Sequence, residues 1–415
     1  MSEPSAPRGP LEGVTVLDLT RALSGPYATL LLGGMGARVI KIEQPGSGDV
    51  ARGNVPYLGR DGVNRLPQHP DDLSIPFLER CRGKLGVTLD FKHPDALAVF
   101  DDLLAEADVV VENFSAGTAD RLGIGYAHAR EVNPRIVYTS ISGFGADAKD
   151  DGKAYDLTIQ ALSGLTMANG RPGEDPVRVG LPLGDMTAPL FAVMGTLAAV
   201  LRARETGAGQ HVDVSMLGAL TSMVAVEPWG GYAATGMAAR TGNYLNRLAP
   251  FGIFRCLDGE VTICAANDRF FARLPAAMGM PELLEDPRFA TRAPRAANAD
   301  EIHRIVGGWA AGLTVAEIHE RLTAADIPVS EVRTPLEATA DPRVLARGET
   351  VPLEHPDHGG ADGVYGSGVP IVFSGTPAGF GGPAPHLGQH NDHVYGDLLG
   401  YGPERVATMR EQGLV

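Results

Sequence analysis

The stretch Gly13-Val14-Thr15-Val16-Leu17-Asp18-Leu19 decides the fold class, because it is a short apolar run that ends at a polar loop. Residues 20–26 form that loop, and residues 27–35 have the apolar character of a helix closed by Gly36. A second apolar run, from Arg38 to Glu43, indicates the next strand. The pattern predicts a βαβ unit, in which two parallel strands are joined by a right-handed crossover.

The same alternation of short apolar runs and helical stretches continues over about the first 150 residues. Three further strands are indicated near residues 86–91, 108–112 and 136–141, with a helix near residues 94–106 between the first two. Strands that alternate with helices predict a doubly wound, Rossmann-like α/β domain. Ligands of such sheets bind beyond the carboxyl ends of the strands, so the loops that follow the strands are the first place to search for a site.

Later in the chain the pattern changes. Residues 186–204 predict a long helix, and residues 211–216 predict a strand. From about residue 227, two β runs joined by the turn Leu257-Asp258-Gly259-Glu260 precede a helical region at residues 270–325. We therefore expect a large α/β domain, a smaller α+β domain and a C-terminal segment that returns to the large domain, over residues 1–226, 227–330 and 331–415.

The composition is that of an ordinary globular protein, since 44% of the 415 residues are hydrophobic and 20% are charged. The net charge of −15 argues against nucleic acid as a partner, although a local group of Lys and Arg can still bind an anion. The 3 cysteines are too few for a disulfide framework, so we expect a reducing, cytoplasmic location. No apolar run reaches the roughly 18 residues that span a bilayer. Residues 1–10 contain no signal-peptide core, so no membrane association is expected.

Asp185 is the most informative single residue, because it stands between a Gly/Pro-rich loop, residues 179–184, and a long apolar run, residues 188–200. An acid at such a junction either caps the helix that follows or presents a carboxylate to a ligand. Taken alone, Asp185 is best interpreted as an N-cap whose side chain accepts a hydrogen bond from the first helical turn. The two roles are compatible, since a helix N-terminus favours the ionised carboxylate that a nucleophile requires.

The other candidates are unspecific when each is taken alone. Arg38 and Lys41 are interpreted as surface charges of an edge strand, and Lys153 as a solvated loop lysine. The run Arg80-Cys81-Arg82-Gly83-Lys84 is interpreted as a solvated face, and Tyr155-Asp156 as a helix start. The chain has no phosphate-binding G-x-x-x-x-G-K-[ST] loop, no G-x-S-x-G elbow and no Cys/His set at zinc spacing, so no metal is expected.

Several segments occur together in an order that is more specific than any one of them. The ordered segments are Val16-Leu17-Asp18-Leu19-Thr20, Ser24-Gly25-Pro26, Arg38-Val39-Ile40-Lys41-Ile42-Glu43, Val111-Glu112-Asn113-Phe114, Tyr155-Asp156, Gly184-Asp185 and Thr206-Gly207-Ala208-Gly209-Gln210. Over nearly the whole chain this order resembles the family III CoA-transferases, the group that contains formyl-CoA transferase, carnitine CoA-transferase and α-methylacyl-CoA racemase. The resemblance implies an interlocked homodimer, and it implies acyl-CoA as a substrate with no permanently bound cofactor.

The resemblance also implies roles for individual residues. Asp185 matches the transferase nucleophile, which moves CoA from an acyl-CoA donor to a carboxylic acid through mixed-anhydride and aspartyl–CoA thioester intermediates. The residues that match CoA-binding positions are Ala22, Leu23, Ser24, Arg82, Lys84, Asn113, Phe114, Lys153 and Tyr155. Gln44 departs from the family pattern, because some members place a basic residue there to help hold the phosphates. The phosphates are then left to other basic residues, namely Arg38, Lys84, Arg121 or Lys153.

The choice between transferase and racemase depends on Tyr155. Racemase members carry a His thirty residues before the aspartate, and Tyr155 occupies that position here. A tyrosine hydroxyl, whose pKa in water is about 10, is a poor base for proton abstraction at neutral pH. We therefore expect a CoA-transferase. The alternatives are α-methylacyl-CoA racemase or another acyl-CoA isomerase, and a CoA-binding protein without catalysis.

The sequence defines the exchanged acids less sharply. Members that use oxalate carry a run of glycines in the small domain, whereas residues 241–247 lack one, so oxalate is disfavoured. Asn246 and Arg247 are candidates to bind a second carboxylate, although Arg247 taken alone is interpreted as a surface charge. This permits a dicarboxylate pair such as succinyl-CoA and another diacid, and it leaves carnitine-type and aromatic acceptors open.

Overall fold

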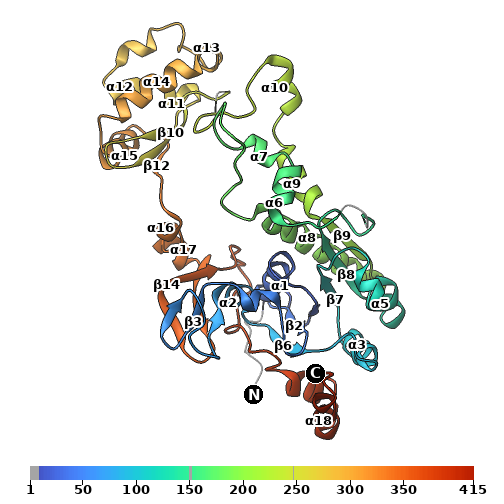
Figure 1. Ribbon diagram of the computed structural model, residues 1–415. Helices are drawn as coiled ribbons and strands as arrows, with labels where there is room; N and C mark the ends of the chain where they lie inside the picture. Colours follow the sequence, from blue (N-terminus) through green and yellow to red (C-terminus); the bar gives the residue numbers. More distant parts are fainter. Residues whose placement is uncertain (1–8, 149–151, 246) are drawn as a thin grey trace. The chain divides into compact units, whose positions relative to one another are not determined.

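The core of the chain is a six-stranded parallel sheet, shown in Figure 1 within the computed structural model, which describes residues 9–148, 152–245 and 247–415. The strands, in their order across the sheet, are β6 (Leu85–Thr88), β2 (Arg38–Glu43), β1 (Thr15–Asp18), β7 (Val109–Glu112), β8 (Val137–Ser142) and β9 (His211–Ser215). Numbered by their appearance along the chain, these strands lie in the order 3-2-1-4-5-6 of the Rossmann fold. The predicted α/β class with a parallel sheet is therefore confirmed.

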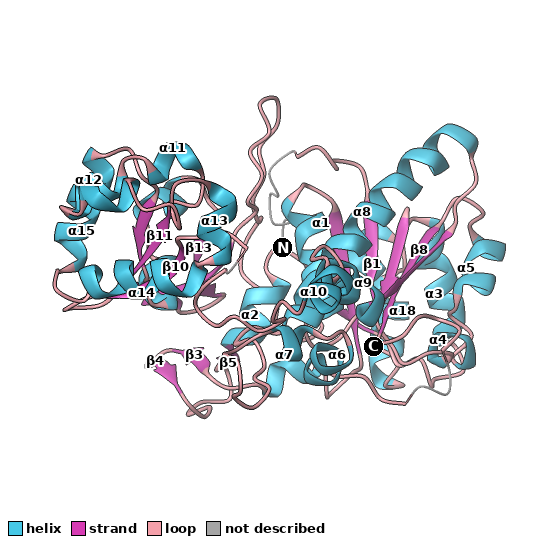
Figure 2. Cartoon of the chain, turned by 90° about the horizontal axis from the view of Figure 1, so that it is seen from above, coloured by secondary structure: helices cyan, strands magenta, loops and turns pink. Residues whose placement is uncertain are grey.

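Helices cover both faces of this sheet (Figure 2), which explains why β1, β2, β6, β7 and β8 are almost continuously buried, whereas the edge strand β9 is only partly buried. On one face, Leu17 and Ile40 belong to a core that includes α3 (Ala96–Ala105), α5 (Tyr126–Val132) and α18 (Pro403–Glu411). On the other face, the strands contact α1 (Ser24–Gly34) and α8 (Leu183–Thr206), which also contact each other. Because both faces are covered, a site for a ligand is left to the loops at the ends of the strands.

Two helices begin earlier than the sequence pattern predicts. The first is predicted from residue 27, but α1 begins at Ser24, and Pro26 lies in its first turn, where a missing N–H breaks no helical hydrogen bond. The long helix is predicted from residue 186, but α8 begins at Leu183. Asp185 therefore lies inside the first turn of α8 and not before it.

The interpretation of four basic residues as surface charges is only partly right. Arg38 is exposed, but β2 is an interior strand between β6 and β1, and Lys41 has 0% exposed surface. Arg82 and Lys84, interpreted as a solvated face, are 5% and 2% exposed. The cause is tertiary: acidic and aromatic groups from distant segments surround these cations, and the local sequence does not reveal such partners.

The chain divides into two compact units. One comprises Met1–Ser163, Val179–Val226 and Thr339–Val415 and contains the parallel sheet. Its further elements are β3 (Tyr57–Gly59), β4 (Gly62–Asn64), β5 (Leu73–Ser74), α2 (Ile75–Cys81), α4 (Thr118–Arg121), α6 (Asp156–Leu162), α9 (Met216–Val224), α17 (Pro342–Ala346), β13 (Thr350–His355) and β14 (Gly359–Ser367).

The other unit comprises Gly164–Arg178 and Glu227–Ala338 and has its own apolar core. Its sheet is antiparallel, as the hairpin turn at Leu257-Asp258-Gly259-Glu260 predicts. The elements of this unit are α7 (Leu165–Ala168), α10 (Trp229–Thr235), β10 (Phe251–Arg255), β11 (Glu260–Cys264), α11 (Asp268–Phe271), α12 (Leu274–Met278), α13 (Arg292–Ala297), α14 (Ala299–Ala310), α15 (Val315–Ala324) and β12 (Val329–Glu331).

Among the described residues, α8 is the one helix that is long and apolar enough to cross a membrane, by length and composition alone. The statement that no apolar segment reaches this length is therefore wrong. α8 contacts α1, α9, β8 and β9, so it is a core helix of the unit that contains the parallel sheet.

Candidate active site

A cavity of about 250 Å³ lies at the carboxyl ends of β1, β7 and β8, and its wall also includes the start of α8. The predicted site residues that line it are Ala22, Leu23, Ser24, Asn113, Phe114, Tyr155 and Asp185. The strand order reverses between β1 and β7, which is the position where Rossmann-ordered sheets bind their ligands. The fold thus brings together at one cavity residues that are far apart in the sequence.

Asp185 lies half-buried in this cavity wall. The expectation that it is the N-cap of the long helix is wrong, because Pro182 occupies the N-cap position. Within the described part of the chain, the Asp185 carboxylate accepts no hydrogen bond. Burial raises the pKa of Asp185 to about 6, the Asp156 carboxylate adds to the rise, and Arg80 opposes it. At neutral pH the side chain is therefore mostly an ionised carboxylate that faces a cavity, which is the state that a nucleophile requires.

The first turn of α8 is capped from outside by Asp156. Its Oδ1 accepts a hydrogen bond from the N–H of Gly184 at 2.8 Å, so the carboxylate of Asp185 is not needed for capping. The predicted helix start at these residues is confirmed, because α6 begins at Asp156 with Tyr155 as its N-cap. The side chain of Tyr155 is exposed and lines the cavity.

The loop after β1 has an unusual backbone conformation. Ala22 has a φ angle of 65°, in the left-handed region that residues with a side chain disfavour. Its N–H donates to Oδ1 of Asp49, and its carbonyl accepts from Arg80, both at 2.9 Å. The Asn113 side chain accepts from the N–H of Arg21 at 2.7 Å and donates to the carbonyl of Arg21 at 2.9 Å. Asn113, which matches a CoA-binding position, therefore also holds the loop that lines the cavity.

Arg82 and Lys84 do not line this cavity. The ammonium group of Lys84 donates to Asp18 at 2.9 Å and to the hydroxyl of Thr29 at 2.8 Å inside a buried cluster. The guanidinium of Arg82 lies over the ring of Phe380, 4.3 Å from its centre. Both cations are enclosed by protein groups, so neither reaches a ligand in the cavity in this conformation.

The remaining basic candidates differ in their relation to the cavity. Arg38 opens β2 and lies at the amino end of the parallel sheet, opposite the cavity. Arg121 is exposed and makes a hydrogen bond within its own helix, α4. Lys153 is exposed and stands in the chain between two residues that line the cavity, Gly152 and Ala154. Of these three cations, Lys153 is therefore the one beside the cavity.

Arg80 is a site residue that the sequence reasoning missed. It belongs to α2, it anchors the carbonyl of Ala22, and its charge lowers the pKa of Asp185 against the effect of burial. The signal in the sequence was its membership of the basic run with Arg82 and Lys84. The spacing of the basic residues from Arg80 to Lys84 does not tell which of them contacts the distant loop at Ala22.

The two candidates for binding a second carboxylate have different outcomes. Asn246 lies outside the described residues. Arg247 belongs to the second unit, where its guanidinium donates to Glu227 at 2.8 Å, and Glu227 also accepts from the hydroxyl of Tyr232. Arg247 thus has an ion-pair partner in its own unit, and its contact with a substrate stays a prediction.

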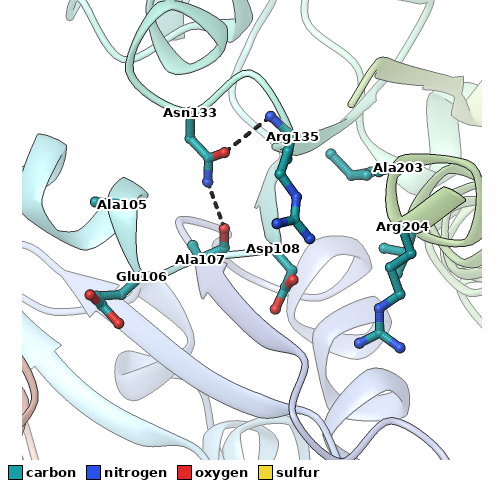
Figure 3. Close-up of a pocket in the computed structure, with 10 residues that line it drawn as sticks. Ala105, Glu106, Ala107, Asp108, Asn133, Arg135, Ala203 and Arg204 are labelled. Carbon is teal, nitrogen blue, oxygen red and sulfur yellow. Dashed lines mark hydrogen bonds between the residues drawn. The ribbon is translucent and has the colours of Figure 1, made fainter. Parts of the chain in front are cut away.

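A second cavity, of about 340 Å³, lies at the amino ends of β7 and β8, at the other end of the sheet (Figure 3). Arg135 and Arg204 line it together with the carboxylates of Glu106 and Asp108. Its lining has mixed charge and includes none of the predicted site residues. The cavity at Asp185 is therefore the better candidate for an active site.

The fold and the cavity together define a class of protein. It is an α/β protein whose Rossmann-ordered sheet presents a half-buried carboxylate to a ligand cavity. Among the residues that the structure describes, no group of 3 or more His, Cys, Asp or Glu side chains could hold a metal ion.

Comparison with known proteins identifies the family. The model of the CoA-transferase family III matches residues 11–391. The chain is 34% identical to succinyl-CoA–D-citramalate CoA-transferase of Chloroflexus aurantiacus, over 100% of both chains. It is 36% identical to acetyl-CoA:oxalate CoA-transferase of Acetobacter aceti, over 90% of this chain and 91% of the relative. The crystal structure of a CAIB/BAIF family protein from Brucella suis superposes with a TM-score of 0.80 at 29% identity, covering 94% of this chain and 100% of the other.

The chain therefore belongs to the CoA-transferase family III, and its activity class is that of an acyl-CoA:carboxylate CoA-transferase. The resemblance inferred from the ordered sequence segments is confirmed.

Proposed function

We propose that Asp185 is the nucleophile of this CoA-transferase. The observation that carries the proposal is the state of its carboxylate, which faces the cavity, is half-buried and accepts no hydrogen bond from the described residues. A carboxylate of raised pKa is more basic than a solvated one, and a more basic oxygen attacks a carbonyl carbon more readily once it is ionised.

The first half of the reaction transfers CoA to the protein. The ionised carboxylate of Asp185 attacks the thioester carbonyl of the acyl-CoA, the C–S bond breaks, and a mixed anhydride and CoA thiolate form. The thiolate then attacks the aspartyl carbonyl of the anhydride. This step forms an aspartyl–CoA thioester and releases the donor acid as its carboxylate.

The second half repeats these steps in reverse with the acceptor. The acceptor carboxylate attacks the aspartyl thioester, which gives a second mixed anhydride and CoA thiolate. Attack of the thiolate on the acceptor's acyl carbon releases the new acyl-CoA and restores the carboxylate of Asp185. Backbone N–H groups in the first turn of α8 are candidates to stabilise the oxyanion in each step.

We propose a dicarboxylic acid on at least one side of the exchange, with succinyl-CoA as the first donor to test. The names of the two relatives support this choice, because succinate, citramalate and oxalate each carry two carboxylates. Arg247 is the proposed partner of the second carboxylate. Oxalate belongs in the same panel of acids, since an oxalate-using relative shares 36% identity although residues 241–247 lack the glycine run.

We also propose Lys153 as the cation that reaches the phosphates of CoA, with Ala22, Leu23, Ser24, Phe114 and Tyr155 along the rest of the bound molecule. The support is position, because these residues line the cavity and Lys153 stands beside it. Replacement of Lys153 by Met is expected to raise the KM for acyl-CoA about tenfold and to leave kcat nearly unchanged, because a phosphate contact is equally strong in the ground and transition states.

We propose that the active form is a homodimer. The supporting observation is a set of exposed apolar side chains on α6, α8 and α9, three helices that contact one another. They are Leu157, Leu162, Leu190, Met194 and Met223. Large apolar side chains exposed on neighbouring helices are the raw material of a protein interface. Sedimentation of a dimer at micromolar concentration would support the proposal, and a monomer that is fully active would contradict it.

The test of the nucleophile uses succinyl-CoA labelled in its CoA moiety, without acceptor. The wild-type protein is expected to retain label as an aspartyl–CoA thioester that hydroxylamine releases, and Asp185→Ala is expected to retain none. Substantial transfer by Asp185→Ala would contradict the proposal. No racemase function is proposed, since Tyr155 lines the cavity where racemase members carry a His.

A further inference from the structure

Asp156 contacts the backbone on which the proposed nucleophile stands. Its Oδ1 accepts from the N–H of Gly184 at 2.8 Å and, more weakly, from the N–H of Asp185 at 3.4 Å. These are N–H groups of the first turn of α8, which has no capping side chain at its own N-cap, Pro182. The carboxylate of Asp156 therefore supplies the cap that α8 lacks.

A buried glutamine connects Asp156 to the loop before α8. Gln160 is 0% exposed, and its Nε2 donates to Oδ2 of Asp156 at 2.7 Å and to the carbonyl of Leu181 at 3.0 Å. Its Oε1 accepts from the N–H of Val179 at 3.0 Å. Asp156 and Gln160 thus hold the loop from residue 179 to residue 185 at several points along one side of α6.

Gly184 allows this close approach. A Cβ atom at Gly184 would lie 3.0 Å from Cγ2 of Ile159 and 3.1 Å from Oδ1 of Asp156, tighter than nine in ten real contacts of a Cβ. A side chain at this position would therefore force Ile159 or Asp156 to shift by a few tenths of an ångström. Asp156 thus contacts the backbone of both residues of the Gly184-Asp185 pair.

We propose that Asp156 is a positioning residue, which holds Asp185 at the cavity wall through the amide of Gly184 and places a second negative charge beside it. This inference rests on the proposed nucleophilic role of Asp185. Asp156 itself does not line the cavity, so it acts through Asp185 and not on the substrate.

The second charge has a functional consequence. The groups that act on Asp185 are Asp156 from α6, which raises its pKa, and Arg80 from α2, which lowers it, in addition to burial. Tyr155, the N-cap of α6, also lines the cavity. A neighbouring negative charge makes the Asp185 oxygen more basic, and a more basic carboxylate is a stronger nucleophile above its pKa.

The test is the pH dependence of thioester formation in a single turnover with labelled acyl-CoA. The wild-type rate is expected to fall below a midpoint near pH 6, where Asp185 becomes protonated. In Asp156→Asn the midpoint is expected to move down by about one pH unit, because the neighbouring negative charge is gone. The limiting rate at high pH is expected to fall about tenfold, because the attacking carboxylate is less basic and less firmly held.

Two further variants separate charge from packing. Gln160→Met removes the hydrogen bonds that hold the loop before α8 but keeps the charge of Asp156. Its rate of thioester formation is therefore expected to fall with no shift of the pH midpoint. Asp213→Asn is a matched control, because Asp213 also holds a cavity loop, through the N–H of Ala146 at 2.9 Å, but is not among the groups that shift Asp185. Its midpoint is expected to stay at the wild-type value.

The outcomes also separate this inference from the proposed function. If the wild-type protein forms no thioester, the nucleophilic role of Asp185 fails. If it does, and Asp156→Asn folds but keeps the wild-type midpoint, the proposed effect of the charge of Asp156 is overturned. A wild-type rate in Gln160→Met would overturn its positioning role. Should Asp156→Asn not fold, Asp156→Ser replaces it, since a serine removes the same negative charge with a smaller side chain.

Discussion

Two carboxylates near the carboxyl end of the sheet, the buried Asp18 and the half-buried Asp185, have opposite environments. Asp18 is 0% exposed, accepts from Lys84 at 2.9 Å and from Thr29 at 2.7 Å, and lies 4.0 Å from Lys41. Burial alone raises its pKa, but Lys84, Lys41 and a neighbouring hydroxyl outweigh burial and hold the pKa well below its usual range. Asp185 has a second carboxylate as its neighbour, and its pKa is raised.

The comparison shows that burial by itself does not decide the role of an acid. Both carboxylates lose water on folding, and that loss favours the neutral form in both. Paired cations reverse the effect at Asp18, which becomes a fixed, ionised part of the core. At Asp185 the effect remains, so the side chain stays close to its titration range and is able to react. Three predictions test this contrast and a fourth tests the strained loop beside the cavity, from the largest expected effect to the smallest.

Asp18→Asn is expected to lower the free energy of unfolding at pH 7 by about 3–5 kcal/mol, because the buried ammonium group of Lys84 loses its carboxylate partner. Lys41 loses only the more distant of its two carboxylate neighbours, since Asp49 remains at 3.0 Å. The stabilisation by Asp18 is present above its ordinary pKa of 3.8 and is lost as the pH falls through its lower folded-state pKa. Urea unfolding of wild type and variant measures the difference. Asp286→Asn, at a partly exposed ion pair with Arg288, serves as the control and should change the urea midpoint far less.

Asp185→Asn is expected to change stability in the opposite direction from Asp18→Asn. It should raise the free energy of unfolding at pH 8 by up to about 3 kcal/mol, while transfer activity is lost. The folded-state pKa of about 6 lies above the ordinary value of 3.8, so the ionised form costs stability above pH 6. As the pH falls through 6 toward 4, wild-type Asp185 takes up its proton and the advantage of the variant should shrink. An advantage that is equal at pH 8 and pH 4 would contradict the assigned charge state.

Arg80→Met is expected to raise the pH midpoint of thioester formation above about 6 by roughly half a unit, the reverse of the shift expected for Asp156→Asn. The cause is the loss of a cation that opposes the effect of burial at Asp185. The same single-turnover assay between pH 4.5 and pH 8 measures it. A midpoint that falls in Arg80→Met would show that the charge of Arg80 does not act on Asp185.

Ala22→Gly is expected to stabilise the protein slightly, by about 0.5 kcal/mol. Release of the left-handed conformation, with its φ of 65°, gains about 1–2 kcal/mol, and the greater freedom of glycine in the unfolded chain offsets about 0.5–1 kcal/mol. Thermal unfolding measures the change, with Ala28→Gly, inside α1, as the destabilising control. A destabilisation as large as that of the control would mean that Ala22 is not strained.

The parallel sheet could be read from the sequence because its signal is local. The pattern predicted the strands β1, β2, β7 and β8 to within two residues, since each is a short apolar run bounded by polar loops. The start of α1 was predicted too late because the pair Gly25-Pro26 usually marks a loop. Here the pair lies in the first turn of α1, where a proline breaks no helical hydrogen bond.

The sequence could predict which residues belong to the candidate site, but not which contacts they make. The family resemblance named Asp185, Tyr155 and Asn113 as site residues, and the fold places all three at one cavity. It also named Lys84 as a CoA-binding position, yet that lysine is buried against Asp18. Lys84 precedes β6, whereas its partner Asp18 is on β1, and no spacing along the chain predicts which acid a buried cation will meet.

The sequence by itself determined the α/β class, the family and the identity of the candidate nucleophile, because apolar periodicity and ordered motifs are properties of the chain alone. The tertiary structure decided the state of that nucleophile: which groups cap its helix, how much water it loses and which charges lie beside it. The physical reason is that hydrophobic patterning acts between neighbours in sequence, whereas desolvation and Coulomb interactions depend on distances in space. Asp156 and Arg80 come close to Asp185 only in the folded protein.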